Sequence, residues 1–258
     1  MIETFVQYMT KLQRERTIRV YVPNNYEYST KSYPVLYMHD AQNLYDDDQS
    51  FFGSSWRMED CLEKSGLELI VVGIDCNPEG TKRSDELTPW IIRKDINKGL
   101  SIDEAIDVGG EGDAYLDFIV HELKPYIDST YRTIQSDTAM AGSSSGGVIS
   151  TYAMCRYPSI FTRVAALSNA YWLCQQEIET LLEESDLSDV KRFYFDVGTN
   201  EQTATFGSDV YLHSNRSVKE LLDRTDVPHR FDIIEDAVHN EIAWRERFPA
   251  ILRYLYEK

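Results

Sequence analysis

The chain has 258 residues, of which 42% are hydrophobic and 12% aromatic, and its formal net charge is −17. The length suits one domain over residues 1–258, and no apolar run approaches the ~20 residues that a membrane span requires. The acidic charge argues against a nucleic-acid partner, because phosphate binding requires a basic surface. We therefore expect a soluble protein that binds neither nucleic acid nor membranes.

The N-terminal segment and the cysteines indicate where the protein works. Residues 1–16 have charged and polar side chains where a secretory signal would have an apolar core, which predicts a cytoplasmic location. The cysteines show neither CxxC pairing nor dense spacing, so we expect buried thiols and no bound metal or cofactor. The four cysteines are Cys61, Cys76, Cys155 and Cys174.

Apolar segments of strand length alternate along the chain with longer segments that have helical periodicity. This alternation predicts an α/β protein with a mostly parallel sheet and helices on both faces. In such sheets ligands bind beyond the carboxyl ends of the strands, so candidate site residues are sought there. Strands are predicted at residues 17–22, 34–38, 69–73, 138–141, 164–167, 193–197 and 231–234, and helices at about 114–127, 146–156, 208–224 and 241–256.

The segment GSSSG fits the pattern G-x-S-x-G and lies between a predicted strand and a predicted helix. A flexible serine-glycine linker is the alternative, but the helical pattern begins at Val148 without a spacer. The pattern is typical of a sharp turn that presents a nucleophilic serine, which here is Ser144. Bulky side chains at Gly142 or Gly146 would collide with the crossing strand and helix.

A serine nucleophile requires a base, and the base requires an orienting carboxylate. Three of the five histidines follow Ser144, namely His213, His229 and His239. Only His239 falls in the loop between the last predicted strand and the terminal helix, where a base would reach the serine. We therefore expect His239 to be the base, with a solvent-exposed loop histidine as the alternative.

Three carboxylates compete for the orienting role. Glu201 follows a Gly-Thr-Asn turn just beyond the strand at 193–197 and is favoured. Asp196 lies within that apolar strand and would be a buried structural carboxylate. Asp236 is nearer to His239 in sequence and stays open as a third candidate.

Several segments together resemble the Putative esterase (esterase D-like) family of α/β hydrolases, which is related to feruloyl esterases, enterochelin esterases and S-formylglutathione hydrolases. The segments are YPVLYMHDAQNLYD, GGEGDAYLDFIVHELKPYIDSTYRT, AGSSSGG, DVGTNE and HNEIAWRERFP, and they span nearly the whole chain. The resemblance implies one α/β-hydrolase domain over residues 1–258 with Ser144 as nucleophile, Glu201 as acid and His239 as base. Relatives usually have aspartate at the position of Glu201.

Acyl transfer also requires donors for the oxyanion of the tetrahedral intermediate. One donor should be the amide of Ser145, directly after the nucleophile, and the other should come from the loop after the strand at 34–38. The resemblance favours the amide of Ala41 or Gln42, where many relatives have glycine in place of Ala41. Asp40 in the same loop and Trp172, which follows a strand end, are candidates for substrate binding.

These residues predict a cofactor-independent serine carboxylesterase that hydrolyses small carboxylic esters through an acyl-enzyme on Ser144. Feruloyl, acetylated-sugar, siderophore and thioester substrates are all open. An acyltransferase or thioesterase with the same triad is the first alternative, and a non-catalytic binding protein on a hydrolase fold is the second. The expected partner is a small-molecule ester, and the sequence leaves a homo-oligomer open.

Overall fold

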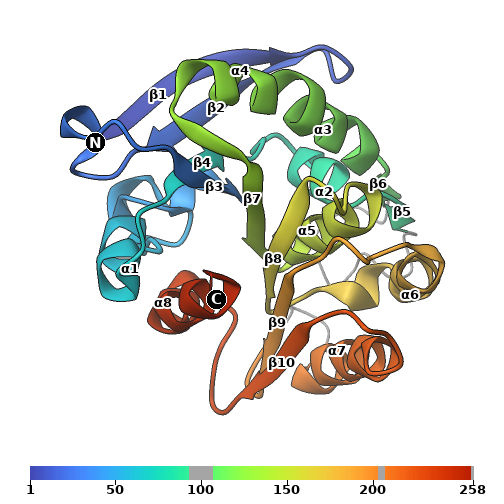
Figure 1. The fold of residues 1–258 in the computed structure, drawn as a ribbon. Helices are drawn as coiled ribbons and strands as arrows, with labels where there is room; N and C mark the ends of the chain where they lie inside the picture. The colour runs from blue at the N-terminus through green and yellow to red at the C-terminus, as the bar shows by residue number, and fades with distance from the viewer. Residues whose placement is uncertain (93–106, 203–206, 257–258) are drawn as a thin grey trace.

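Eight strands form the central sheet of the computed structural model, which describes residues 1–92, 107–202 and 207–256 (Figure 1). Their order is β1-β2-β4-β3-β7-β8-β9-β10. The pairs β1/β2 and β2/β4 are antiparallel, and every later neighbour pair in this order is parallel. The strands are β1 (Ile2–Met9), β2 (Arg14–Tyr21), β3 (Tyr33–His39), β4 (Ile70–Ile74), β7 (Thr133–Ser143), β8 (Phe161–Leu167), β9 (Arg192–Gly198) and β10 (His229–Ile234).

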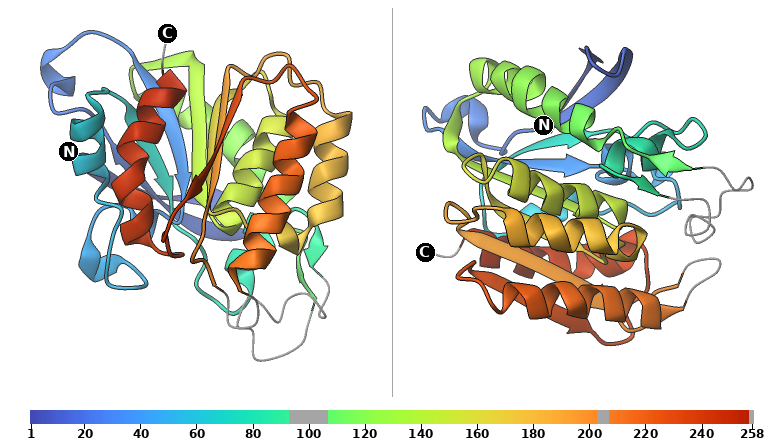
Figure 2. Two further views of the ribbon diagram at one scale, coloured as in Figure 1. Left: turned by 90° about the horizontal axis from the view of Figure 1, so that it is seen from below. Right: turned by 90° about the vertical axis from the view of Figure 1, so that its right-hand side faces the viewer.

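Helices cover both faces of the sheet, as the two views in Figure 2 also show. One face carries α1 (Met58–Ser65) and α8 (Glu241–Tyr256). None of the helices in the described ranges is long and apolar enough to cross a membrane. The other face carries α3 (Gly112–Phe118), a π-helical turn (Ile119–Leu123), α4 (Lys124–Thr130), α5 (Ser145–Arg156), α6 (Gln175–Glu184) and α7 (Ser208–Leu222), with α2 (Lys82–Leu87) and the hairpin of β5 (Ile91–Ile92) and β6 (Val108–Gly109) alongside.

Strand β3 shows why the central strands are apolar at every position. Val35 and Tyr37 belong to the core beneath α3 to α7, whereas Leu36 and Met38 belong to the core beneath α1 and α8. Successive side chains of a strand point to opposite faces, so a strand with helices on both sides is buried throughout. The continuous apolar runs in the sequence therefore follow from the two-sided covering.

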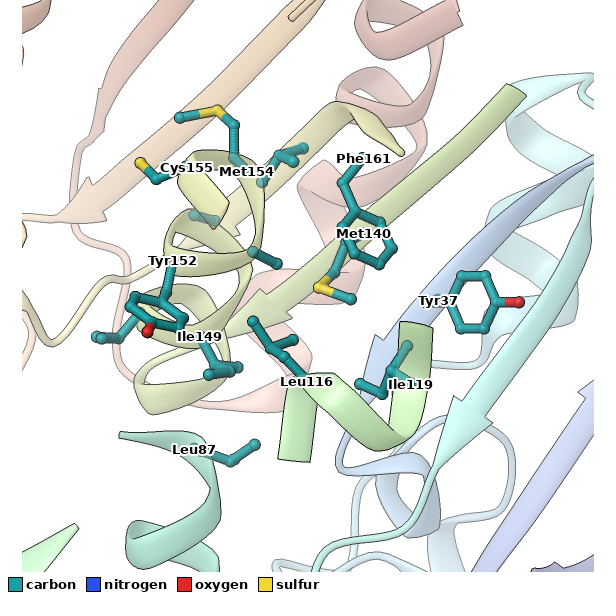
Figure 3. Close-up of a cluster of buried hydrophobic side chains, with 14 of the residues drawn as sticks. Tyr37, Leu87, Leu116, Ile119, Met140, Ile149, Tyr152, Met154, Cys155 and Phe161 are labelled. Carbon is teal, nitrogen blue, oxygen red and sulfur yellow. The ribbon is translucent and has the colours of Figure 1, made fainter. Parts of the chain in front are cut away.

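The larger of the two cores joins the middle of the sheet to α3 and α5. Figure 3 shows Met140 of β7 and Phe161 of β8 with Leu116 of α3 and Ile149 of α5 in one cluster. Each of these four side chains has essentially no solvent exposure. This packing fixes the position of α5 relative to β7, and the turn between those two elements contains Ser144.

The predicted mostly parallel sheet with helices on both faces is confirmed, and each predicted strand and helix is present. The predicted helix at 114–127 is interrupted by the π-helical turn, after which Pro125 stands at the start of α4. Proline lacks the N–H donor of a regular helix and is best accommodated in a first turn. Strand β1 and the helices α1, α2 and α6 were not predicted, because these segments are short or largely exposed.

The cysteines are all unpaired thiols. Cys61, Cys155 and Cys174 are buried, as predicted, and burial raises the pKa of the Cys61 thiol to about 11. Cys76 is the exception, because it is only half-buried. It lies two residues after the end of β4. It lies beside the loop after β3, where it supports part of the candidate site.

Candidate active site

Ser144 occupies the turn between β7 and α5 in a strained backbone conformation, with φ 58° and ψ −122°. A positive φ is unfavourable for a residue with a side chain and persists only where surrounding contacts impose it. Here the amide of Ser144 donates to the carbonyl of Leu167 (2.9 Å), and its own carbonyl accepts from the amides of Gly147 (3.0 Å) and Val148 (3.2 Å). The partly exposed Ser144 is thus held at the carboxyl edge of the sheet.

The two glycines of the G-x-S-x-G motif differ in how much space surrounds them. A Cβ at Gly142 would lie 2.5 Å from the carbonyl oxygen of Gly146, so the expectation that Gly142 excludes a side chain is confirmed. At Gly146 a Cβ would lie 3.6 Å from Cβ of His39, so a methyl group fits there, and the expected collision of a bulky side chain stays a prediction. The second crowded position is Gly147, where a Cβ would lie 2.0 Å from Oδ1 of Asn169.

His239 lies between β10 and α8 and contacts a buried carboxylate. Its Nδ1 is 2.8 Å from Oε2 of Glu201, a residue with no solvent exposure. The other oxygen of Glu201 accepts from the amide of Gly198 at 2.6 Å, which fixes the plane of the carboxylate. Because Nδ1 is occupied by Glu201, Nε2 is the ring nitrogen left to exchange protons.

The other two acid candidates have different surroundings. Asp196 is fully buried, and its oxygens accept from Nε of Arg247 (2.7 Å) and from the amide of Ser168 (2.8 Å). Asp236 is exposed, in a turn where its φ is 58°. Glu201 is the one of the three whose side chain is bonded to His239.

Ser144 and His239 line one pocket of about 240 Å³ at the carboxyl edge of the sheet. A larger surface pocket of about 540 Å³ borders it at Phe51 but is not lined by Ser144 or His239. The smaller pocket is therefore the candidate active site. Its wall also includes Asp40, Asn43, Phe51, Phe52, Arg83 and Glu241.

Asp40, a predicted substrate-binding residue, lies at the wall of this pocket in an ion pair. Its backbone is left-handed (φ 55°, ψ 46°), and its two oxygens accept from Nε (2.7 Å) and Nη2 (2.8 Å) of Arg83. Burial alone would raise the pKa of Asp40, but the guanidinium outweighs burial and the pKa is lowered. The ion pair holds the strained first residue of the loop after β3.

The loop continues as a 3-10 turn, Ala41–Asn43, whose first amides are predicted oxyanion donors. The turn's own hydrogen bonds begin with the amide of Asn43, which donates to the carbonyl of Asp40 (2.9 Å). The turn itself therefore does not use the amides of Ala41 and Gln42. The amide of Ser145, at the first position of α5, likewise has no carbonyl to bond within its helix.

Alanine fits at position 41 because of the strand beneath it. The left-handed residue is Asp40, so Ala41 needs no glycine-like backbone. A Cβ at Gly73 of β4 would lie 2.6 Å from Cβ of Ala41, so the alanine methyl group occupies the space above this glycine. The side chain of Gln42 accepts from the amide of Cys76 (3.0 Å), which ties the loop to the end of β4.

Trp172 lies in a 3-10 turn (Tyr171–Leu173) after β8 and packs edge-on against Tyr211, with ring centroids 5.9 Å apart. Tyr211 in turn lies 5.2 Å from the ring of His239. Trp172 is not part of the wall of the 240 Å³ pocket. Its assignment to substrate binding stays a prediction.

Several side chains of the site escaped the sequence reasoning. Arg83 lies on α2, far from every motif, and nothing in the sequence links it to Asp40. His39 is buried with Nδ1 2.8 Å from the Tyr115 hydroxyl, and burial lowers its pKa to about 4, so it supports the loop as a neutral ring. Glu241 lies two residues after His239. Its role could not be read from the sequence, because acidic residues are common in the first turn of any helix.

Comparison with known proteins agrees with this architecture. The family model described as "Putative esterase" matches residues 9–255. The Bacillus subtilis (strain 168) protein YbbA is 26% identical over 251 residues, covering 94% of this chain and 93% of YbbA. The structure of an IroE-like serine hydrolase from Shewanella oneidensis is similar over 100% of this chain and 80% of its own, with TM-score 0.78 and 20% identity.

A ferulic acid esterase structure is similar over 98% of both chains, with TM-score 0.71 and 19% identity. The structural likeness shows the α/β-hydrolase fold, and the family model spans nearly the entire sequence. The chain therefore belongs to the Putative esterase family and has the α/β-hydrolase fold.

Proposed function

We propose that the protein hydrolyses small carboxylic esters through an acyl-enzyme on Ser144, with His239 as the general base and Glu201 as its orienting acid. The observation that carries this proposal is the hydrogen bond between His239 and the buried Glu201. His239 lines the same pocket as Ser144, whose backbone is strained. A serine hydroxyl at such a turn and an oriented imidazole are the two groups that acyl transfer requires.

The first half of the reaction forms the acyl-enzyme. Oγ of Ser144 attacks the ester carbonyl while its proton passes to Nε2 of His239, and Glu201 stabilises the imidazolium through Nδ1. The carbonyl oxygen becomes an oxyanion that accepts hydrogen bonds from the amide of Ser145 and from that of Ala41 or Gln42. When the tetrahedral intermediate collapses, His239 gives the proton to the leaving alcohol.

The second half releases the acid. Water loses a proton to His239 as its oxygen attacks the acyl carbon, and the same amides hold the second oxyanion. His239 then returns the proton to Oγ of Ser144 as the acyl–serine bond breaks. Every proton thus passes through His239, so no cofactor enters the scheme.

The pocket favours small substrates. Its volume of about 240 Å³ lies below the 300–1,000 Å³ that is typical of sites for drug-sized ligands. The exposed rings of Phe51 and Phe52 at its wall supply apolar surface for an aromatic or alkyl group. Feruloyl and short-chain acyl esters are therefore both included in the substrate panel.

The test is covalent labelling with a fluorophosphonate, read by intact-mass spectrometry on the wild type and on Ser144→Ala. We expect one adduct on the wild type only, and a loss of ester turnover of about 10⁴-fold or more in the variant, since catalysis by a triad is lost when its nucleophile is removed. Circular dichroism of both proteins checks the fold. An adduct on Ser144→Ala, or a wild type that is neither labelled nor active on p-nitrophenyl and feruloyl esters, would refute the proposal.

A further inference from the structure

Glu241 is a buried carboxylate in the pocket wall that the proposed mechanism does not use. It is the first residue of α8 and only 2% exposed, and it lines the same pocket as Ser144 and His239. Oε1 accepts from Nδ2 of Asn43 at 3.1 Å. Oε2 is buried and has no hydrogen-bond partner among the residues that the structure describes.

The partner of Glu241 is itself fixed. Oδ1 of Asn43 accepts from the amide of Phe51 (3.1 Å), and its carbonyl accepts from the amide of Trp56 (2.8 Å). The orientation of the Asn43 amide is therefore set by the backbone, with its Nδ2 directed to Glu241. Because Oε1 is held by this donor, the carboxylate has a defined position, and Oε2 is the oxygen left without a partner among the described residues.

Among the residues that the structure describes, no cationic side chain forms an ion pair with Glu241. Arg83 directs both Nε and Nη2 to Asp40, and His239 is bonded to Glu201. Burial raises the pKa of Glu241, and the charge of Asp40 reinforces this effect. The backbone amide of Glu241 and the charges of His239 and Arg83 oppose it. A buried acceptor is normally satisfied, so an acceptor left open in a ligand pocket indicates where a ligand donor binds.

We propose that Glu241 determines substrate specificity by accepting a hydrogen bond, at Oε2, from a hydroxyl or amine carried by the ester close to the scissile bond. The inference rests on the proposed function, because the ligand is the ester that Ser144 attacks. A site built around a polar partner discriminates strongly against an analogue that lacks the partner, since the buried group is then left unpaired. Esters with such a donor are therefore the preferred substrates of this pocket.

The experiment compares paired esters that differ only in the donor. For the acyl side the pair is p-nitrophenyl 3-hydroxybutyrate and p-nitrophenyl 3-methoxybutyrate, with the 3-aminobutyrate ester as the amine arm. For the alcohol side the pair is 2-hydroxyethyl and 2-methoxyethyl butyrate. We expect the wild type to show a higher kcat/KM for the donor-bearing ester of one pair, by about tenfold or more.

The variant Glu241→Gln tests whether this selectivity comes from Oε2. Glutamine retains an oxygen for Asn43 but replaces the open acceptor with an NH₂ donor, so the selectivity ratio should fall by about tenfold. Glu246→Gln, an exposed glutamate on the same helix, is the matched control and should keep the wild-type ratio. Glu241→Asp, which withdraws the carboxylate by one methylene, serves if the glutamine variant does not fold.

Two outcomes overturn the inference without touching the proposed function. One is a fluorophosphonate-reactive wild type that hydrolyses both members of each pair, the amine arm included, with equal kcat/KM. The other is a selectivity ratio that is unchanged in a folded, labelled Glu241→Gln protein. A wild type that takes no label at all contradicts the proposed function instead, so the two failures are distinguishable.

Discussion

The two sides of the active-site pocket are held in place by different kinds of contact. On the side of the base, Glu201 and His239 are positioned by the turns that directly follow β9 and β10, and the two turns are joined by backbone hydrogen bonds such as the one from the Asn200 amide to the Ala237 carbonyl (3.1 Å). On the side of the proposed oxyanion donors (the oxyanion side), the loop of residues 40–43 after β3 (the oxyanion loop) is held by the side chains of Arg83 of α2 and, through His39, of Tyr115 of α3. Ala41 of this loop also packs directly over Gly73 of β4.

The difference has a consequence for how each side tolerates change. Turns at the ends of neighbouring parallel strands lie close together whatever the side chains nearby, because strand pairing fixes their spacing. Around the left-handed Asp40 of the oxyanion loop lie the ion pair with Arg83, the buried His39 and the close contact of Ala41 with Gly73. We therefore expect single changes on the base side to remove chemistry, and single changes on the oxyanion side to displace the loop.

The largest expected effect is on the base side, in the comparison of Glu201→Gln with Asp236→Asn. Glutamine keeps an acceptor for the Gly198 amide but presents an NH₂ group to Nδ1 of His239, which selects the wrong tautomer. We expect kcat to fall by about 10³- to 10⁴-fold, by analogy with the amide substitution of a triad acid. Steady-state kinetics on a p-nitrophenyl ester measure it.

Asp236→Asn is the control for this prediction, since Asp236 is an exposed turn residue near His239 in sequence. Asparagine also tolerates its left-handed backbone, so activity and stability should stay near wild type. If Asp236→Asn lowered kcat as much as Glu201→Gln, the acid would be wrongly assigned.

The contact between Glu201 and His239 could be expected from the sequence for a physical reason. A strand, a turn with Gly-Thr-Asn and an acidic residue occur in one short segment, and a histidine between the last strand and the last helix is equally local. The support of Asp40 by Arg83 could not be predicted, because the pair is 43 residues apart and depends on how α2 packs. The space around Gly146 and Gly147 likewise depends on His39 and Asn169, whose positions only the folded chain defines.

A smaller effect is expected at the turn that joins the two sides, in the comparison of Gly142→Ala with Gly146→Ala. The methyl group at position 142 would lie 2.5 Å from the backbone oxygen of Gly146, so β7 and α5 must separate. Overpacking of this kind costs about 1–3 kcal/mol in the free energy of unfolding, and displacement of Ser144 should lower kcat as well.

Gly146→Ala should behave in the opposite way. Its methyl group has ordinary contact distances, and alanine is favoured over glycine within a helix by about 0.5–1 kcal/mol. Urea unfolding and ester kinetics of both variants provide the measurement. Equal destabilisation by the two substitutions would contradict the inference that position 142 is crowded and position 146 is not.

The smallest expected effect is on the oxyanion side, where Gly73→Ala should displace the loop and Ala41→Gly should restore it. The new methyl group would lie 2.6 Å from that of Ala41. Strand β4 is paired with β2 on one side and β3 on the other, so the loop is the partner expected to move. Because oxyanion donors act on the transition state, kcat should fall more than KM rises. Ala41→Gly alone should change kcat little, and the double variant should recover most of the activity lost in Gly73→Ala.

The coupling energy from this double-mutant cycle then reports how strongly β4 positions the oxyanion loop. Recovery is expected to be incomplete, since a Cβ at Gly73 would also lie 3.1 Å from Cδ1 of Leu44. Additive effects of the two substitutions would mean that the alanine methyl group does not transmit the position of β4 to the loop. In that case the side-chain contacts, above all the ion pair of Asp40 with Arg83, would position the loop, and Arg83→Lys should lower kcat by more than Gly73→Ala does.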